Sequence, residues 1–327
     1  MKRRTKAALG AASVLTGMYA ANKLIYKNTP KLESVLDGDK KYFNTKYGQT
    51  FYVKNGDGEP LIFVHGLASG MSSFMWRKNF EELAKHFTVY AIDLPGFGKS
   101  DKKAIIYKPY MYIDVLRTFA KDVVGEPAYV ISSGQSSAYI FQLEYENPGM
   151  FKKIVTVCPT GIFELSSPPA LNQKLLSFSL RTPIIGTFAY NVMVSKPSIK
   201  YFLKRKTYYN KENASAYVIN QYSKASKQNK SLSKYAPASF LGGYLNYSII
   251  GILPYINSPT LIIWGENAKI NTINNLKSFI DLNPKIIYNV IDNSGYLPQE
   301  EHPAEFNGIC KNFLLTSNDS NAQAEFA

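Results

Sequence analysis

Residues 130–141, VISSGQSSAYIF, contain the serine best placed to act as a nucleophile. The centre of this stretch, Gly134 to Ala138, fits the pattern small-X-Ser-X-small between a predicted strand and a predicted helix. Such a turn is so tight that the residues two positions from the serine must be small, and it exposes the serine hydroxyl. We therefore predict Ser136 as the candidate nucleophile. Ser137 fits less well, because glutamine and tyrosine would stand at the positions that should be small.

A serine nucleophile also needs N–H groups aimed at the oxygen that becomes negative in the transition state. Residues 62–70, IFVHGLASG, end a predicted strand with His65-Gly66 and then small residues, which leaves the backbone room to point N–H groups into a cavity. We predict the N–H groups of Leu67 and Ser137 as the two oxyanion donors. His65 and Gly66 are predicted to shape the pocket.

The surrounding pattern indicates the elements that position these residues. Continuous apolar strands alternate with segments of helical periodicity along most of the chain, which favours an α/β fold with a mostly parallel sheet covered by helices on both faces. The predicted strands and the last helix are at 61–64, 88–92, 128–132, 153–158, 259–265, 285–291 and 303–315.

The alternation stops at residues 162–257, where prolines interrupt the helical patterns. We interpret this segment as a helical cap inserted between sheet strands, above the edge where open α/β sheets bind ligands. The predicted domains are an N-terminal segment at 1–30, a core at 31–161 and 258–315, the cap at 162–257 and a disordered tail at 316–327. The cap holds 12 Lys and Arg residues against Glu164 and Glu212, a net charge of +10 within a chain of net charge +14.

The N-terminus pairs basic residues with an apolar run. MKRRTK precedes the uncharged stretch 7–21, and Lys23, Lys27 and Lys31 follow. Fifteen uncharged residues are few for a span of about 20, and the run also resembles a signal peptide. Because Tyr19 fits a cleavage site poorly, we predict an uncleaved single membrane anchor. A cleaved signal and a surface-lying helix are the alternatives, and the membrane face is left open.

With these motifs in this order, the chain resembles the α/β-hydrolase family in its cap-bearing, esterase-like or lipase-like form. The resemblance covers about residues 45–315. It rests on ordered motifs: His65-Gly66, Asp93 to Ser100, Gly134 to Ala138, Trp264-Gly265 and His302-Pro303. The resemblance implies hydrolysis of an ester, amide, epoxide or carbon–carbon bond by a Ser–His–acid triad.

Two positions depart from the pattern that this resemblance implies. The acid position after the Trp-Gly strand holds Ala268, within WGENAKI, and the histidine position holds Tyr296, within NSGYLP. A phenol has a reference pKa of about 10 against about 6.5 for histidine, so roughly one in a thousand is ionised at neutral pH. A neutral phenol has no basic nitrogen to take the serine proton.

The chain has only three histidines to replace the missing base. His65 belongs to the turn after the first parallel strand, His86 precedes another strand, and His302 opens the last helix. We expect none of them to act on Ser136. In serine proteases, loss of the histidine costs on the order of 10⁶ in turnover.

Two functions follow from these observations. The first is a catalytically degenerate, membrane-associated protein that binds a small or acyl ligand under the cap, or another protein. The second is an active serine ester hydrolase that uses Ser136 with an unrecognised base. An assay with an active-site serine probe distinguishes the two.

Partners and cofactors are predicted from the remaining features. We expect no cofactor and no metal, since Cys158 and Cys310 have no metal-ligand spacing. A lipid-like ester or acyl ligand is the expected small molecule, and the N-terminus and the basic cap are the expected contacts with a membrane. Nucleic acid is not expected, because no recognised binding motif accompanies the charge.

Overall fold

The computed structural model describes residues 3–316. All but the first residue of the predicted disordered tail, 316–327, therefore lie outside the described residues. Within the described part, eight strands form one sheet in the order β1-β2-β4-β3-β5-β6-β7-β8. The strands are β1 (Asp39–Thr45), β2 (Gly48–Asn55), β3 (Pro60–Val64), β4 (Thr88–Ile92), β5 (Ala128–Ser133), β6 (Phe151–Val157), β7 (Thr260–Gly265) and β8 (Ile287–Ile291).

The sheet is mostly parallel, which confirms the predicted fold class. Strands β3 to β8 pair in parallel, and only β1 and β2 add antiparallel pairs at one edge. Every residue of β3 and β7 is buried, as continuous apolar strands require when helices cover both faces. The register aligns Val64 with Ile92 and with Ser132, so the carboxyl ends of neighbouring strands meet at one edge of the sheet.

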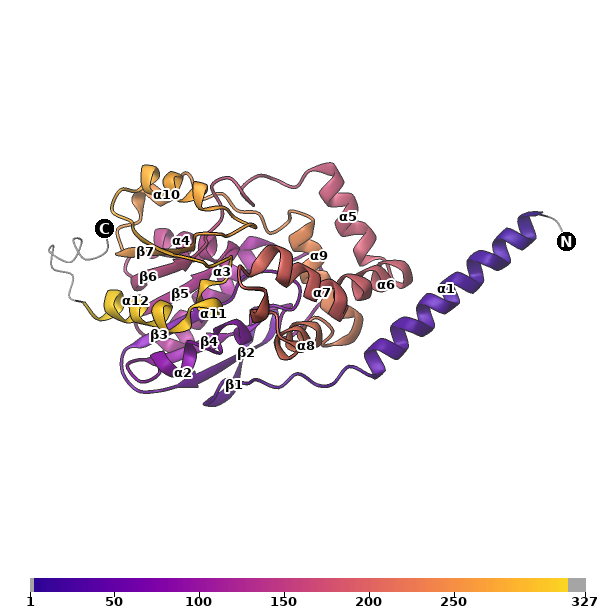
Figure 1. Ribbon diagram of the computed structural model, residues 1–327, viewed down its shortest axis with the longest axis horizontal. Helices are drawn as coiled ribbons and strands as arrows, with labels where there is room; N and C mark the ends of the chain where they lie inside the picture. The colour runs from indigo at the N-terminus through magenta and orange to yellow at the C-terminus, as the bar shows by residue number, and fades with distance from the viewer. Residues whose placement is uncertain (1–2, 317–327) are drawn as a thin grey trace.

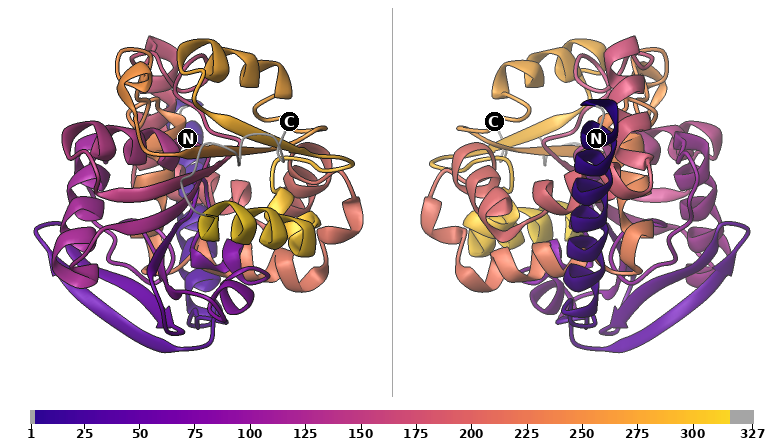
Figure 2. Two further views of the ribbon diagram at one scale, coloured as in Figure 1. Left: turned by 90° about the vertical axis from the view of Figure 1, so that its left-hand side faces the viewer. Right: turned by 90° about the vertical axis from the view of Figure 1, so that its right-hand side faces the viewer.

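Helices pack on the two faces of this sheet. Figure 2 shows α2 and α12 on one face and α3 and α4 on the other. Trp76, Trp264, Phe63 and Phe306 are fully or almost fully buried in the core between these layers. The covering helices are α2 (Phe80–Leu83), α3 (Pro109–Thr118), α4 (Gln135–Glu146), α10 (Leu276–Leu282), α11 (Pro298–Glu301) and α12 (Pro303–Leu315).

Between β6 and β7 the chain forms helices and turns with no strand. We call residues 162–257 the helical insert; Figure 1 shows it gathered at one side of the sheet. Two of its prolines stand where helices begin: Pro183 immediately precedes α6, and Pro197 stands in the first turn of α7. The insert helices are α5 (Leu171–Arg181), α6 (Ile184–Met193), α7 (Lys196–Phe202), α8 (Ala216–Ala225) and α9 (Tyr235–Leu241).

The N-terminal segment forms one helix, α1 (Arg3–Lys27), that extends away from the body of the protein (Figure 1). The predicted membrane anchor is wrong for this helix, because none of the helices within residues 3–316 is long and apolar enough to cross a membrane. The physical reason is composition. Its uncharged stretch, 7–21, is rich in Ala, Gly, Ser and Thr, and at 1.5 Å per residue it spans only about 22 Å of a hydrocarbon core of about 30 Å.

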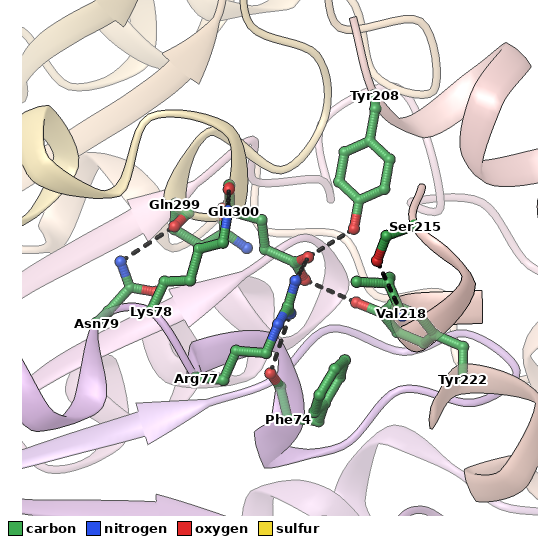
Figure 3. A network of polar contacts seen from close by, with 10 residues as sticks. All are labelled: Phe74, Arg77, Lys78, Asn79, Tyr208, Ser215, Val218, Tyr222, Gln299 and Glu300. Carbon is green, nitrogen blue, oxygen red and sulfur yellow. Dashed lines mark hydrogen bonds and ion pairs between the residues drawn. The ribbon is translucent and has the colours of Figure 1, made fainter. Parts of the chain in front are cut away.

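A buried ion pair within the core is contacted by two tyrosines of the helical insert (Figure 3). Arg77 Nη2 donates to Glu300 Oε2 at 2.7 Å, and both side chains are largely buried. Two tyrosines of the insert complete the network: Tyr208 Oη donates to Glu300 Oε2 at 2.5 Å, and Tyr222 Oη donates to Glu300 Oε1 at 2.7 Å. Although burial opposes its charged form, the Glu300 carboxylate raises the pKa of Arg77 above its ordinary value. Glu300 therefore accepts from three residues and is a fully paired buried charge.

Candidate functional site

The structure places Ser136 at the turn where β5 ends and α4 begins. Gly134 has φ 56° and ψ −128°, a backbone conformation that L side chains rarely adopt, and α4 starts at the next residue. A Cβ built on Gly134 would lie 2.5 Å from Tyr296 Oη, so glycine is also required by space. Ser136 is fully buried. The sequence pattern and the strand–turn–helix geometry agree at this position, and the role of nucleophile stays a prediction.

The hydroxyl of Ser136 donates a hydrogen bond to the main-chain oxygen of His65 at 2.7 Å. A peptide carbonyl accepts a hydrogen bond but cannot take the proton, whereas a serine becomes a nucleophile only when a base removes that proton. In this arrangement the proton of Ser136 is directed at a group that stabilises the neutral hydroxyl.

The imidazole of His65 is fully occupied within its own turn. Its Nδ1 lies 2.8 Å from the Gly66 oxygen, and its Nε2 accepts from the Leu94 N–H at 2.9 Å, which assigns the ring proton to Nδ1. Burial lowers the pKa of His65 from its ordinary value, against the opposing effect of Asp93. His65 therefore shapes the loop as a neutral ring and offers no free nitrogen to Ser136.

The other two histidines lie away from this turn. His86 is exposed after the end of α2, just before β4 begins, at the opposite edge of the sheet from the carboxyl ends of the strands. His302 precedes α12, and its Nε2 lies 3.2 Å from the Asn293 oxygen. Neither imidazole forms a hydrogen bond with Ser136 in the described residues.

The two predicted oxyanion donors differ in their present bonds. The N–H of Leu67 donates no hydrogen bond within residues 3–316, whereas the N–H of Ser137 donates to the Gly134 oxygen at 3.2 Å. The Ser137 N–H belongs to the first turn of α4. Amide groups in the first turn of a helix can bind an anion. An oxyanion at this turn would find the Leu67 N–H free but would compete with Gly134 for the Ser137 N–H.

The loop after β4 is held by Asp93, which is almost fully buried. Its Oδ1 accepts from the Ser73 N–H at 2.7 Å, and its Oδ2 accepts from the Lys99 N–H at 2.8 Å. A Cβ built on Gly98, whose φ is 47°, would lie 2.1 Å from Asp93 Oδ2. The glycine-rich motif after this strand therefore stabilises the local backbone, and none of its side chains forms a hydrogen bond with Ser136 in the described residues.

Tyr296 is half-buried beside the serine turn, and its backbone is fixed by the insert. Its N–H donates to the Thr207 oxygen at 2.8 Å. Burial, followed by the proximity of Cys158 and Glu164, raises the pKa of Tyr296 above that of a free phenol. A raised pKa keeps the hydroxyl neutral, so less phenolate is available to accept a proton here than in water.

After β7 the chain brings together polar side chains that the sequence interpretation missed. Ala268 is buried, whereas Glu266 is exposed and accepts from the Asn293 N–H at 3.4 Å. Asn271, three residues after Ala268, is buried and donates to the Pro159 oxygen at 2.6 Å. Asn275 donates to Asn271 Oδ1 at 2.7 Å and to Glu164 Oε2 at 2.6 Å. The sequence signal for this cluster is two asparagines at i and i+4 after a buried strand.

Two further residues lock the insert over the serine turn. Gln135, the residue before Ser136, accepts from Thr160 Oγ1 at 2.5 Å and donates to the Leu245 oxygen at 3.1 Å. Tyr139 Oη donates to the same Leu245 oxygen at 2.7 Å. Sequence reasoning missed the two contacts with Leu245 because their partners are separated by more than 100 residues. Within residues 3–316 no group of His, Cys, Asp and Glu side chains is arranged to hold a metal ion.

The comparisons with known proteins agree with this architecture. Residues 59–303 match the family described as the alpha/beta hydrolase fold. The chain belongs to the α/β-hydrolase family, as its motifs predicted. Over 280 residues, 84% of this chain and 90% of the relative, it is 22% identical to a 2-hydroxy-6-oxo-6-(2'-aminophenyl)hexa-2,4-dienoic acid hydrolase of Metapseudomonas resinovorans. Over 274 residues, 79% of this chain and 94% of the relative, it is 26% identical to a pimeloyl-[acyl-carrier protein] methyl ester esterase of Wigglesworthia glossinidia brevipalpis.

A solved structure shows the same fold. The crystal structure of a serine hydrolase involved in carbazole degradation superposes with a TM-score of 0.70 at 20% identity. The match covers 85% of this chain and 99% of that one. At this level of identity the likeness establishes the fold, and the chemistry of this chain has to be argued from its own residues.

Proposed function

We propose that this protein is a non-hydrolytic member of the α/β-hydrolase family, which uses the fold to bind a small or acyl ligand beneath the helical insert. The observation that carries the proposal is the hydrogen bond from Ser136 Oγ to the His65 oxygen, in a turn that the neutral phenol of Tyr296 contacts. The usual histidine and acid positions hold Tyr296 and Ala268. Hydrolysis by Ser136 then lacks a group that can accept its proton.

The test is covalent labelling of the full-length protein with a fluorophosphonate probe, together with turnover of short-chain p-nitrophenyl esters. We expect no labelling of the wild-type chain and no turnover above background. We expect both to appear in the double variant Tyr296→His plus Ala268→Asp, because these changes supply a base and an acid at the positions that the family uses. Adding Ser136→Ala to that double variant is the matched control and should abolish both signals.

Wild-type labelling that disappears in Ser136→Ala would contradict the proposal. That outcome would favour the second candidate, an active serine ester hydrolase. Two observations support this alternative: the free N–H of Leu67 beside the serine turn, and relatives named as a hydrolase and an esterase. In that case the Ser136 hydroxyl would have to leave the His65 oxygen when substrate binds, and the base would be a group outside the usual position.

A further inference from the structure

A cavity separate from the serine turn lies between α1 and the helical insert. Its volume is about 630 Å³, within the range of about 300–1,000 Å³ that small-molecule sites occupy. The helix α1 packs against α6, and Figure 1 shows the end of α1 beside the insert. The cavity is lined by Tyr19, Asn22, Lys23, Tyr26, Lys27, Pro183, Ile184, Thr187, Lys230, Ser231, Lys234 and Tyr235.

The lining combines positive charge with apolar surface. Four lysines line it: Lys23, Lys27, Lys230 and Lys234. It has no acidic residue, and none of the four forms a salt bridge within the described residues. The rest of the wall is largely three tyrosine rings, a proline and an isoleucine. Such a wall favours a ligand with one anionic end and one apolar part.

Lys234 carries the argument, because it is a buried cation without a counter-ion. The residue is 1% exposed. Its ammonium group donates to the Thr182 oxygen at 2.6 Å and to Thr187 Oγ1 at 2.7 Å, which uses two of its three protons. Burial lowers the pKa of Lys234 to about 8. The ammonium also lies over the neutral Tyr235 ring, 5.5 Å from its centroid. A buried charge held only by neutral groups is costly, and an anion in the cavity would supply the missing opposite charge.

A second polar group in the same wall also lacks a partner. The hydroxyl oxygen of Tyr26 is buried and makes no hydrogen bond of normal geometry within the described residues, although the nearby Asn191 side chain partly offsets the rise that burial causes in its pKa. Neighbouring Asn22 is already used, since it donates to the Ile184 oxygen and accepts from Asn191. The cavity therefore presents a third lysine proton and a phenol hydroxyl that a ligand headgroup can engage.

From these observations we infer that the cavity binds a single-chain anionic amphiphile, with a carboxylate or phosphate headgroup near Lys234 and an alkyl chain along the tyrosine, proline and isoleucine side chains. None of the lining residues belongs to the serine turn, so the inference does not depend on whether Ser136 is catalytic.

The experiment is isothermal titration calorimetry of the full-length protein with four probes, each below its micelle concentration. Decanoate and decyl phosphate carry the anion and the chain, 1-decanol carries the chain alone, and inorganic phosphate carries the anion alone. We expect one saturable site for decanoate, for decyl phosphate, or for both, and which of them binds more tightly identifies the headgroup. We expect binding at least tenfold weaker for 1-decanol and for inorganic phosphate.

Variants locate the site. Lys234→Met keeps the length of the side chain and removes its charge, and we expect it to weaken binding of the preferred amphiphile at least tenfold. Lys23→Gln plus Lys27→Gln removes two charges on the α1 side of the cavity, and we expect it to weaken binding of the preferred amphiphile several-fold. This variant tests the site even if Lys234→Met fails to fold. Lys200→Met, on the exposed surface of α7, removes the same charge away from the cavity and should bind within twofold of wild type.

Three results would overturn the inference. They are the absence of saturable binding by either anionic amphiphile, binding of 1-decanol as tight as that of decanoate and decyl phosphate, and unchanged affinity in both the Lys234 variant and the α1 double variant. The last result would place the bound amphiphile elsewhere in the protein.

Discussion

Tyr296 and Gly134 are in contact across the serine turn: a Cβ built on Gly134 would lie 2.5 Å from the Tyr296 hydroxyl oxygen. The contact joins the loop after β8 to the turn after β5, and the peptide N–H of Tyr296 bonds in turn to Thr207 of the helical insert. The loop after β8, the serine turn and the helical insert thus all contact Tyr296. A phenol in this position fills space above the turn and adds no basic nitrogen.

The first prediction tests that contact. Gly134→Ala should lower the free energy of unfolding by about 2–4 kcal/mol, because alanine is disfavoured at φ 56° and its methyl group would overlap the phenol. Gly125→Ala is the matched control. Gly125 also has a positive φ, 82°, but nothing lies within 4 Å of its built Cβ, so about 1–2 kcal/mol is expected. Urea denaturation measures both. Equal losses in the two variants would show that the contact with Tyr296 contributes nothing.

The second prediction concerns the buried ion pair of Arg77 and Glu300, which two tyrosines of the helical insert contact. Arg77→Met should lower the free energy of unfolding by about 3–5 kcal/mol, because it leaves Glu300 as a buried charge without its cation. Lys85→Met breaks the exposed ion pair with Glu82 and should change the free energy of unfolding by less than about 1 kcal/mol. Denaturant unfolding of the two variants provides the comparison. A loss below about 1 kcal/mol for Arg77→Met would mean that Tyr208 and Tyr222 alone satisfy the carboxylate.

The third prediction is a dependence of stability on pH. His65 is neutral in the fold because burial lowers its pKa, whereas in the unfolded chain it gains a proton below about 6.5. The unfolded state therefore binds more protons in this range, so the free energy of unfolding should fall as pH decreases below 6.5. Chemical denaturation between pH 7.5 and 5.5 measures the slope, which should be reduced in His65→Asn.

His86→Asn is the control for this slope, because it replaces an exposed histidine. In this variant the free energy of unfolding should depend on pH as it does in the wild-type chain. A slope that disappears in His86→Asn and persists in His65→Asn would contradict the assignment to the buried ring.

The fourth prediction concerns the docking of α1. Asn22 bonds to the Ile184 oxygen and to Asn191, so Asn22→Ala leaves two polar groups of α6 without partners. A loss of about 1.4 kcal/mol in docking would raise the population of detached α1 about tenfold. Limited trypsin digestion after Lys23 and Lys27 should accelerate accordingly.

Ser13→Ala provides the comparison for α1, because Ser13 is exposed and bonds only within its own helix. Its rate of cleavage should match that of the wild-type chain. If Asn22→Ala also matched the wild type, the two asparagine bonds would not hold α1 against the insert.

The parallel sheet and the serine turn could be predicted because their signals are local. Continuous apolar strands, the small residues around Ser136 and the prolines of the insert each follow from the conformational needs of a few neighbouring residues. The prediction of the N-terminal anchor failed on the same local evidence. That prediction rested on the lack of charged residues in 7–21, whereas a membrane-spanning helix must also be long enough and strongly apolar.

The sequence by itself determined which residue types stand at the serine turn and at the positions where a base and an acid were expected, because identity and order along the chain need no coordinates. Tertiary structure decided what those residues touch. The bond from Ser136 to the His65 oxygen, the network around Glu300 and the lysine-lined cavity beside α1 join residues 71 to more than 200 positions apart. Such contacts depend on how whole elements pack, and no local periodicity encodes the distance between two side chains that meet only after folding.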